Sequence, residues 1–120
     1  MAKYETTFIV RQDMSPNEVD KLADNYIGVI EQMGGTLVKK EYWGLRNLAY
    51  IIKKGKKGHY IMLGLDAPFE AVKEIRRQMS INEDIIREVT LRVEEISKNP
   101  SLMMKQNREA SNQASEEIEE

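Results

Sequence analysis

The sequence contains no cysteine, a single histidine and a single tryptophan among its 120 residues. Without cysteine there is no disulfide framework and no thiolate metal site, and we expect a chain that works in the reducing cytoplasm. The lone imidazole, at His59, has no second histidine to share a metal and no evident partner to orient it as a general base. We therefore interpret His59 as a structural or incidental residue. We predict a protein that is not an enzyme and carries no metal and no cofactor.

Long apolar runs are missing as well. No stretch approaches the roughly 20 residues that a membrane-spanning helix needs. The first ten residues, MAKYETTFIV, carry charges at Lys3 and Glu5, so they lack the apolar segment of a secretory signal. We expect no membrane partner. Apolar residues nevertheless make up 41% of the chain, which suffices for one modest core in one domain.

An excess of positive charge, common in nucleic-acid-binding domains, is also absent, because the formal net charge is −2. The distribution of charge is more informative. Residues 97–120 hold three basic and five acidic side chains, and subtracting these from the totals of 18 and 20 leaves 15 of each sign in residues 1–96. The last segment is rich in Ser, Asn, Gln and Glu. We predict a folded domain over residues 1–96 and a flexible acidic tail over residues 97–120.

The first half of the folded part predicts a strand, a helix and a second strand. Residues 3–11 alternate as a strand whose Tyr4 and Phe8 lie on the more apolar face. Ser15 fits a helix N-cap, and Glu18 three positions later completes a capping box. This helix ends at the pair of glycines 34 and 35. Residues 36–52 read as a long strand with a bulge at Gly44.

The second half repeats the order strand, helix, strand. Residues 53–58 form a predicted hairpin loop, and residues 59–65 return as a strand with Ile61, Leu63 and Leu65 on one face. Pro68 suits the first position of a second helix. Residues 81–84 connect this helix to a last strand over residues 85–93. Apolar and polar residues alternate in that strand, but the alternation does not determine which of the two sets faces the core.

The order strand, helix, strand, strand, helix, strand predicts the α+β ferredoxin-like fold, βαββαβ, with a four-stranded antiparallel sheet and two helices on one face. Several strands carry apolar or aromatic residues on both sides, whereas a solvated face should alternate cleanly. We therefore predict that the uncovered face or an edge strand meets a partner. The alternative is the usual scatter of surface apolar residues. The candidate partner contacts are Tyr60, Met62, Leu102 and Met103.

Aromatic and basic residues gather between positions 42 and 58. Trp43 and Arg46 lie on the predicted strand together with Tyr42 and Tyr50, and the loop that follows is rich in lysine. Rings that stack on bases, next to concentrated positive charge, suit RNA. The candidate RNA-binding residues are Lys3, Trp43, Arg46, Lys53, Lys54, Lys56, Lys57, Arg87 and Arg92.

Each of these residues also has an ordinary structural interpretation. A lysine-rich hairpin loop can simply be solvated, Arg46 can form a cross-strand ion pair, and Trp43 can be a partly buried aromatic on an edge strand. Arg87 stands among apolar neighbours, which favours contact with RNA or a partner. Lys3 and Arg92 are the weaker candidates.

The same residues resemble a known family, the sixth protein of the bacterial small ribosomal subunit. The similarity covers residues 1–96, and its most specific part is the run WGLRNLAY placed before a basic hairpin loop. The chain departs from the family at Ile51, where a proline is common, so the strand end loses a fixed φ. The matching segments are Tyr4-Glu5, Gly34-Gly35, residues 43–50, Lys53-Lys54, residues 58–60 and residues 82–87.

The resemblance implies a structural constituent of the small ribosomal subunit that binds 16S ribosomal RNA in its central domain. It also implies pairing with the eighteenth small-subunit protein, in support of assembly and translation, and no small-molecule substrate. Two other classes are weighed beside it. A ferredoxin-like regulatory module that binds a small ligand and dimerises through its sheet would need a ligand-selecting cluster. A small hydrolase of this fold would need a positioned catalytic group, and the sequence shows neither.

Overall fold

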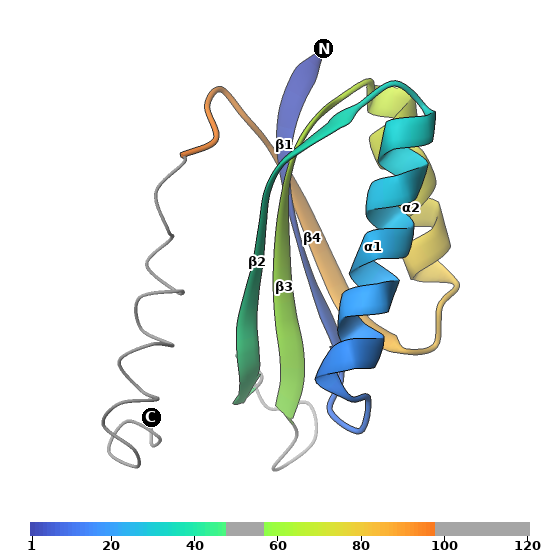
Figure 1. The fold of residues 1–120 in the computed structure, drawn as a ribbon, viewed down its shortest axis with the longest axis vertical. Helices are drawn as coiled ribbons and strands as arrows, with labels where there is room; N and C mark the ends of the chain where they lie inside the picture. Colours follow the sequence, from blue (N-terminus) through green and yellow to red (C-terminus); the bar gives the residue numbers. More distant parts are fainter. Residues whose placement is uncertain (48–56, 98–120) are drawn as a thin grey trace.

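The computed structural model describes residues 1–47 and 57–97. The order of elements in this part of the chain confirms the predicted alternation of strands and helices (Figure 1). The elements are β1 (Ala2–Arg11), α1 (Pro16–Gln32), β2 (Thr36–Asn47), β3 (Lys57–Ala67), α2 (Phe69–Ser80) and β4 (Ile85–Val93).

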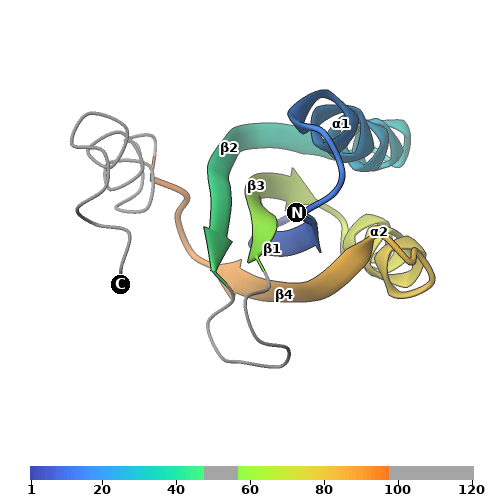
Figure 2. The same ribbon diagram turned by 90° about the horizontal axis from the view of Figure 1, so that it is seen from below.

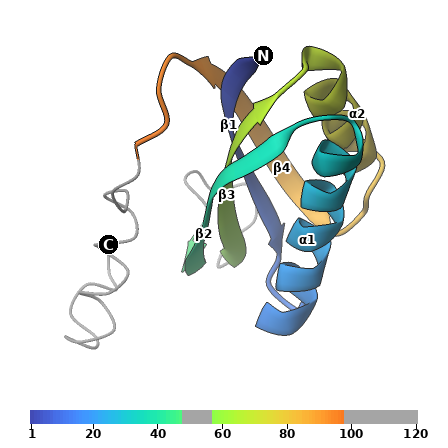
Figure 3. The same ribbon diagram turned by 45° about the horizontal axis from the view of Figure 1, so that its top comes forward.

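The four strands form one antiparallel sheet in the order β2-β3-β1-β4, so β2 and β4 are its edges. Both helices lie on the same face of this sheet, as Figures 2 and 3 show from two directions. We call the opposite side the open face. This arrangement confirms the predicted ferredoxin-like fold.

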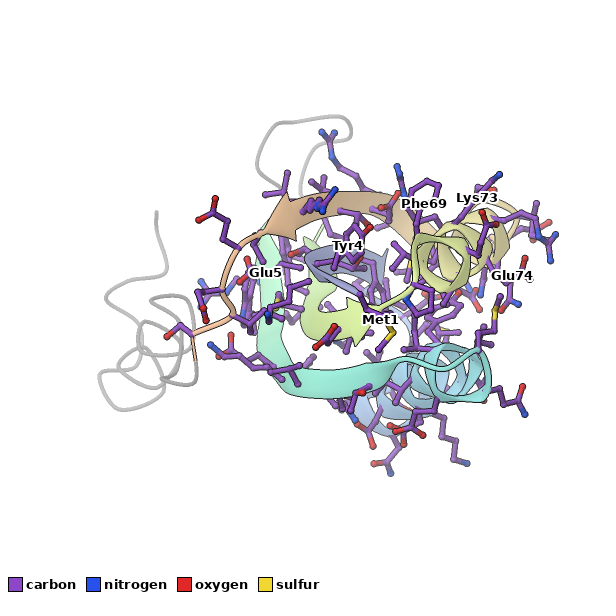
Figure 4. All side chains as sticks on the ribbon, turned by 90° about the horizontal axis from the view of Figure 1, so that it is seen from above. Met1, Tyr4, Glu5, Phe69, Lys73 and Glu74 are labelled. Atoms are coloured by element: carbon purple, nitrogen blue, oxygen red, sulfur yellow. The ribbon has the colours of Figure 1, made fainter. Side chains whose placement is uncertain are left out.

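The core lies between the two helices and the central strands β1 and β3. Phe8 of β1 and Leu63 of β3 have no exposed surface, and the ring of Phe8 meets Tyr26 of α1 edge-on with centroids 5.6 Å apart. Figure 4 shows Tyr4 on the helix side of β1 and Glu5 on the other side. The predicted faces of both strands are therefore confirmed, and burial of these large side chains is the main stabilising contribution.

Helix α1 begins where the sequence predicts. The Ser15 hydroxyl accepts a hydrogen bond from the Glu18 backbone N–H at 3.1 Å, and the Glu18 carboxylate accepts one from the Ser15 N–H at 2.8 Å. These two bonds satisfy backbone donors that a helix start leaves unpaired. Helix α2 differs by one position, because Pro68 is its N-cap and Phe69 its first residue. The extended backbone of an N-cap suits the φ of −64° that the proline ring favours.

Strands β2 and β3 form the predicted hairpin, with one difference at the start of β3. Gly44 has a φ of +93°, and the pairing register shifts between Tyr42 and Gly44, which confirms the predicted bulge. Lys57 and Gly58 were predicted in the loop, and that boundary is wrong, since β3 already begins at Lys57. Gly58 pairs with Arg46 on one side and Arg11 of β1 on the other, so long-range pairing overrides the local turn preference of glycine.

Strand β4 turns its polar set toward the helices. The Thr90 hydroxyl lies 2.6 Å from the hydroxyl of Thr6, which is fully buried on the helix side of β1. The alternating residues Val89, Leu91 and Val93 consequently lie on the open face. Val89 and Leu91 remain 42% and 58% exposed, so the edge of the open face presents apolar surface.

The chain crosses back over the open face after β4. We call residues 94–97 the strap; it runs on the side of the sheet away from the helices (Figure 2). Ile96 is buried, with 6% of its surface exposed, and its side chain lies over Gly64 of β3. The Lys39 ammonium of β2 donates to the Ser97 carbonyl at 2.8 Å. The strap therefore covers part of the face that the sequence analysis treated as bare.

Candidate nucleic-acid interface

The centre of the candidate site is a pair of stacked rings on the open face. Trp43 of β2 and Tyr60 of β3 have ring centroids 6.5 Å apart and planes inclined by 19°. Such an offset stack is a favourable arrangement of two aromatic rings. Both side chains are half-buried, so part of each ring stays accessible. The prediction placed Trp43 with RNA and Tyr60 with a protein partner, whereas the structure puts the two in one surface.

The sheet register extends this pair into a row across all four strands. Tyr60 pairs with Ile9 of β1, and Ile9 pairs with Arg87 of β4. Side chains at paired positions lie on the same face, so Tyr60, Ile9 and Arg87 follow one another across the open face, and Trp43 extends this row through its stack on Tyr60. Arg87 is exposed, and its contact with RNA or a partner stays a prediction. The row joins an aromatic platform at one edge to a cation at the other.

Basic residues stand at the same end of the sheet as the row. The Arg46 guanidinium donates from Nε to the Trp43 carbonyl at 3.0 Å, which fixes the arginine beside the ring. Lys57 follows on β3 and is exposed. Arg46, Lys57 and Arg87 thus share one end of the molecule with Trp43, and this is the end from which the predicted lysine loop departs.

A buried ion pair is hydrogen-bonded to the indole of Trp43. Trp43 donates from Nε1 to the Glu41 carboxylate at 2.8 Å, and the other oxygen of Glu41 lies 3.4 Å from the Lys39 ammonium. Glu41 is only 5% exposed. A buried carboxylate needs such partners, because leaving it unpaired would be costly. These contacts hold the indole in one orientation.

His59 is a structural residue, as predicted. It is buried, its Nε2 lies 2.8 Å from the Met14 carbonyl, and its Nδ1 lies 2.8 Å from the Tyr42 hydroxyl. Since a carbonyl only accepts, Nε2 donates to Met14, and Nδ1 shares a hydrogen bond with the Tyr42 hydroxyl. Burial raises the pKa of Tyr42 above its ordinary value, which keeps that hydroxyl protonated. The network ties the hairpin to the connection between β1 and α1.

Two candidate RNA contacts lie apart from the others. Lys3 pairs with Val93 at the far end of β1, on the open face but away from Trp43. Arg92 pairs with Tyr4, so it belongs to the helix side of β4. The structure therefore does not bring Lys3 and Arg92 together with the aromatic row, and their role in RNA binding stays a prediction.

The remaining candidates divide between a buried residue and residues outside the described part. Met62 lies on the open face but is 4% exposed, so a partner reaches it only if its surroundings move. The other candidates lie outside the described residues: Lys53, Lys54, Lys56, Leu102 and Met103.

Arg11 is a further basic residue near this end of the sheet, and the sequence analysis did not consider it as a candidate. It pairs with Gly58 next to Arg46 and is exposed, but Asp84 at 2.7 Å and Asp13 at 3.4 Å balance its charge. Its place at the end of β1 gave no signal, because only the long-range register brings it beside the hairpin.

The sequence of this chain matches the model of one protein family, ribosomal protein S6, over residues 3–92. The chain belongs to the ribosomal protein S6 family. Small ribosomal subunit protein bS6 of Paramagnetospirillum magneticum is 56% identical over 104 residues, which are 87% of this chain and 72% of that protein. The bS6 protein of Rickettsia canadensis is 50% identical over 105 residues, 88% of this chain and 87% of that one.

A solved S6 structure supports the same assignment at the level of the fold. The crystal structure of 30S ribosomal protein S6 from Thermotoga maritima superposes with a TM-score of 0.70 at 26% identity, covering 92% of this chain and 97% of that chain. The suspected family resemblance is thereby confirmed. This S6-family chain is a component of the small ribosomal subunit, and the prediction of a structural protein rather than an enzyme is confirmed by its family.

Among residues 1–47 and 57–97, no three His, Cys, Asp or Glu side chains gather so as to hold a metal ion. Neither helix in the same residues is long and apolar enough to cross a membrane.

Proposed function

We propose that this chain binds 16S ribosomal RNA of the central domain through the end of the open face that carries Trp43, Arg46 and Arg87. The observation that carries the proposal is the row from the stacked Trp43–Tyr60 pair to Arg87, with Arg46 anchored at the Trp43 carbonyl. Partly exposed rings can accept a base by stacking, and arginines provide bidentate contacts to phosphate. The lysines of residues 53–57 follow directly on this end in the sequence.

The second part of the proposal is a protein partner, the eighteenth small-subunit protein, bound through apolar surface of the open face. Support comes from the exposed side chains of Val89 and Leu91, which lie on an edge strand. Exposed apolar residues at two-residue spacing on an uncovered edge are characteristic of a surface that meets another chain. The RNA-binding row and this apolar surface share one face, so both partners can be held at once.

The RNA part is tested by the salt dependence of binding. The affinity of the native chain for a 16S central-domain fragment, measured with the eighteenth protein present, should fall steeply with salt, since each phosphate contact releases counterions. Replacing Lys53, Lys54, Lys56 and Lys57 together by alanine should lower both the affinity and the slope. A matched control replaces Lys21 and Lys73, which are exposed on the two helices. An unchanged slope in the loop variant would remove the loop from the interface.

The partner part is tested by association of the two proteins without RNA. Leu91→Lys places a charge on the exposed apolar surface and should weaken the heterodimer in sedimentation experiments. Ile81→Lys is the matched control, since Ile81 is 69% exposed in the connection between α2 and β4. Equal association of both variants would contradict a partner surface on β4.

A further inference from the structure

The strap is linked to Trp43 by a continuous chain of contacts. Ser97 accepts from the Lys39 ammonium at 2.8 Å, Lys39 lies 3.4 Å from Glu41, and Glu41 accepts from the Trp43 indole at 2.8 Å. The last described residue of the chain is thus connected through two charged side chains to the aromatic centre of the candidate site.

The strap can pack closely on the sheet because residue 64 is a glycine, which has no side chain. A Cβ atom built on Gly64 would lie 2.9 Å from Cγ2 of Ile96 and 3.2 Å from Cβ of Lys39. The first distance is shorter than side chains tolerate, so Ile96 packs there only because residue 64 is glycine. Gly64 lies in the middle of β3, where glycine otherwise weakens a strand. Close approach of the strap is the physical reason for a glycine at this position.

Burial of the ion pair gives the strap an energetic role. Glu41 is 5% and the Lys39 side chain 12% exposed, although both stand on edge strand β2 of an otherwise uncovered face. Ser97 accepts the hydrogen bond from Lys39, and Ile96 beside it packs on Gly64, the residue that pairs with Lys39 across the strands. Interactions between charges strengthen when water is excluded, and a hydrogen bond to a buried carboxylate holds its donor more firmly. The donor in this case is the Trp43 indole.

We propose that Ile96, seated on Gly64, is a positioning residue: through Lys39 and Glu41 it holds the Trp43 ring in the orientation that binds RNA. The inference rests on the proposed function and adds to it a segment at the end of the folded domain, far in sequence from the hairpin. Interfaces that are ordered before binding lose less conformational entropy on association. The strap thereby contributes to RNA affinity without contacting the RNA itself.

The single tryptophan of the chain makes the first part of the test direct. The variants are Ile96→Ala, Gly64→Ala and Lys39→Met, and the matched control is Ile81→Ala, which makes the same change at an exposed isoleucine. In the first three the emission of Trp43 should shift to longer wavelength and its quenching by acrylamide should increase. The control should resemble the native chain. Circular dichroism and thermal unfolding verify that each variant is folded, which is expected because Ile96 is outside the helix-side core.

The second readout is the affinity for the 16S central-domain fragment in the presence of the eighteenth protein. We expect each strap variant to bind more weakly than the native chain, by less than the roughly 5- to 150-fold loss that removal of a stacked ring causes. Unchanged fluorescence in Ile96→Ala and Gly64→Ala would overturn the inference, and so would altered fluorescence at native affinity. If the native chain itself does not bind this RNA, the proposed function fails, and the fluorescence alone decides whether the strap holds Trp43.

Discussion

The indole of Trp43 and the phenol ring of Tyr60 stack across β2 and β3, with centroids 6.5 Å apart. The same indole donates to Glu41, so it has a ring partner on one side and a hydrogen-bond partner at its edge. A ring held by both is ready to accept a nucleotide base without first being ordered.

Trp43→Ala should lower the affinity for central-domain RNA by about 1–3 kcal/mol, the range measured for one base–aromatic stack. Trp43→Phe keeps a ring but loses the indole N–H, so it should retain most of the affinity. Filter binding at two salt concentrations measures both. If Trp43→Ala binds as the native chain does, the ring belongs to the structure of the hairpin and not to the interface.

Two arginines of β4 provide an internal comparison. Arg87 stands in the open-face row with Ile9, whereas Arg92 pairs with Tyr4 on the helix side. Arg87→Ala should reduce RNA affinity and lower the slope of log affinity against log salt by about one, as expected for one lost phosphate contact. Arg92→Ala should have a smaller effect on the RNA affinity and on the salt slope. Equal losses in the two variants would contradict an interface confined to this end of the open face.

The loss of folding stability on replacement of a phenylalanine by alanine should depend on how deeply that phenylalanine is buried. Phe8 is fully buried and touches Tyr26, while Phe69 is 58% exposed at the outer start of α2 (Figure 4). Phe8→Ala should destabilise the fold by about 3–5 kcal/mol, the usual cost of this change in a core. Phe69→Ala should stay within about 0.5 kcal/mol. Urea unfolding measures the change in the free energy of unfolding of each variant, provided that the m-value is unchanged. Similar losses of stability in the two variants would contradict a core centred on Phe8.

One carboxylate has a specific pH dependence. Two nitrogens of Arg77 donate to Glu74, and Gln78 adds a third donor, which lowers the pKa of Glu74 from 4.5 to about 2. Because the folded-state pKa is depressed, the pair stabilises the fold above about pH 4.5, and this contribution is lost as the pH falls toward 2. The effect on stability should be small, since the pair is exposed to solvent.

Arg77→Gln removes the main cause and should return the pKa of Glu74 most of the way to 4.5. Arg76→Gln is the control, because Arg76 bonds to Glu88 instead. The side-chain carboxyl shift of Glu74, followed by NMR between pH 2 and 6, reads the pKa directly. A native Glu74 that titrates near its ordinary value would show that the pair does not persist in solution.

Local sequence signals predicted most of the fold. The capping box of Ser15 and Glu18, the alternation of β1 and the bulge at Gly44 each rest on contacts between residues close in sequence, and each was confirmed. The start of β3 was misplaced, because Gly58 is held in the sheet by strands on both sides. Interactions of that kind are invisible to a local pattern.

The candidate site was predicted less completely. Trp43, Arg46 and Arg87 were chosen for their chemistry, but only the sheet register shows that they share one end of one face, with Lys3 and Arg92 elsewhere. The strap gave no signal, since Ile96 is one apolar residue after two glutamates and has no periodicity. Its significance comes from Gly64, which lies on a distant strand.

The central claim, that Trp43 lies in the RNA interface, is tested most directly by the accessibility of this tryptophan in the complex. Acrylamide quenching of Trp43 is measured in the preformed pair with the eighteenth protein, before and after saturation with 16S central-domain RNA. The account predicts that RNA quenches the emission and shields the ring from acrylamide. Tight, salt-dependent RNA binding that leaves both quantities unchanged would contradict it.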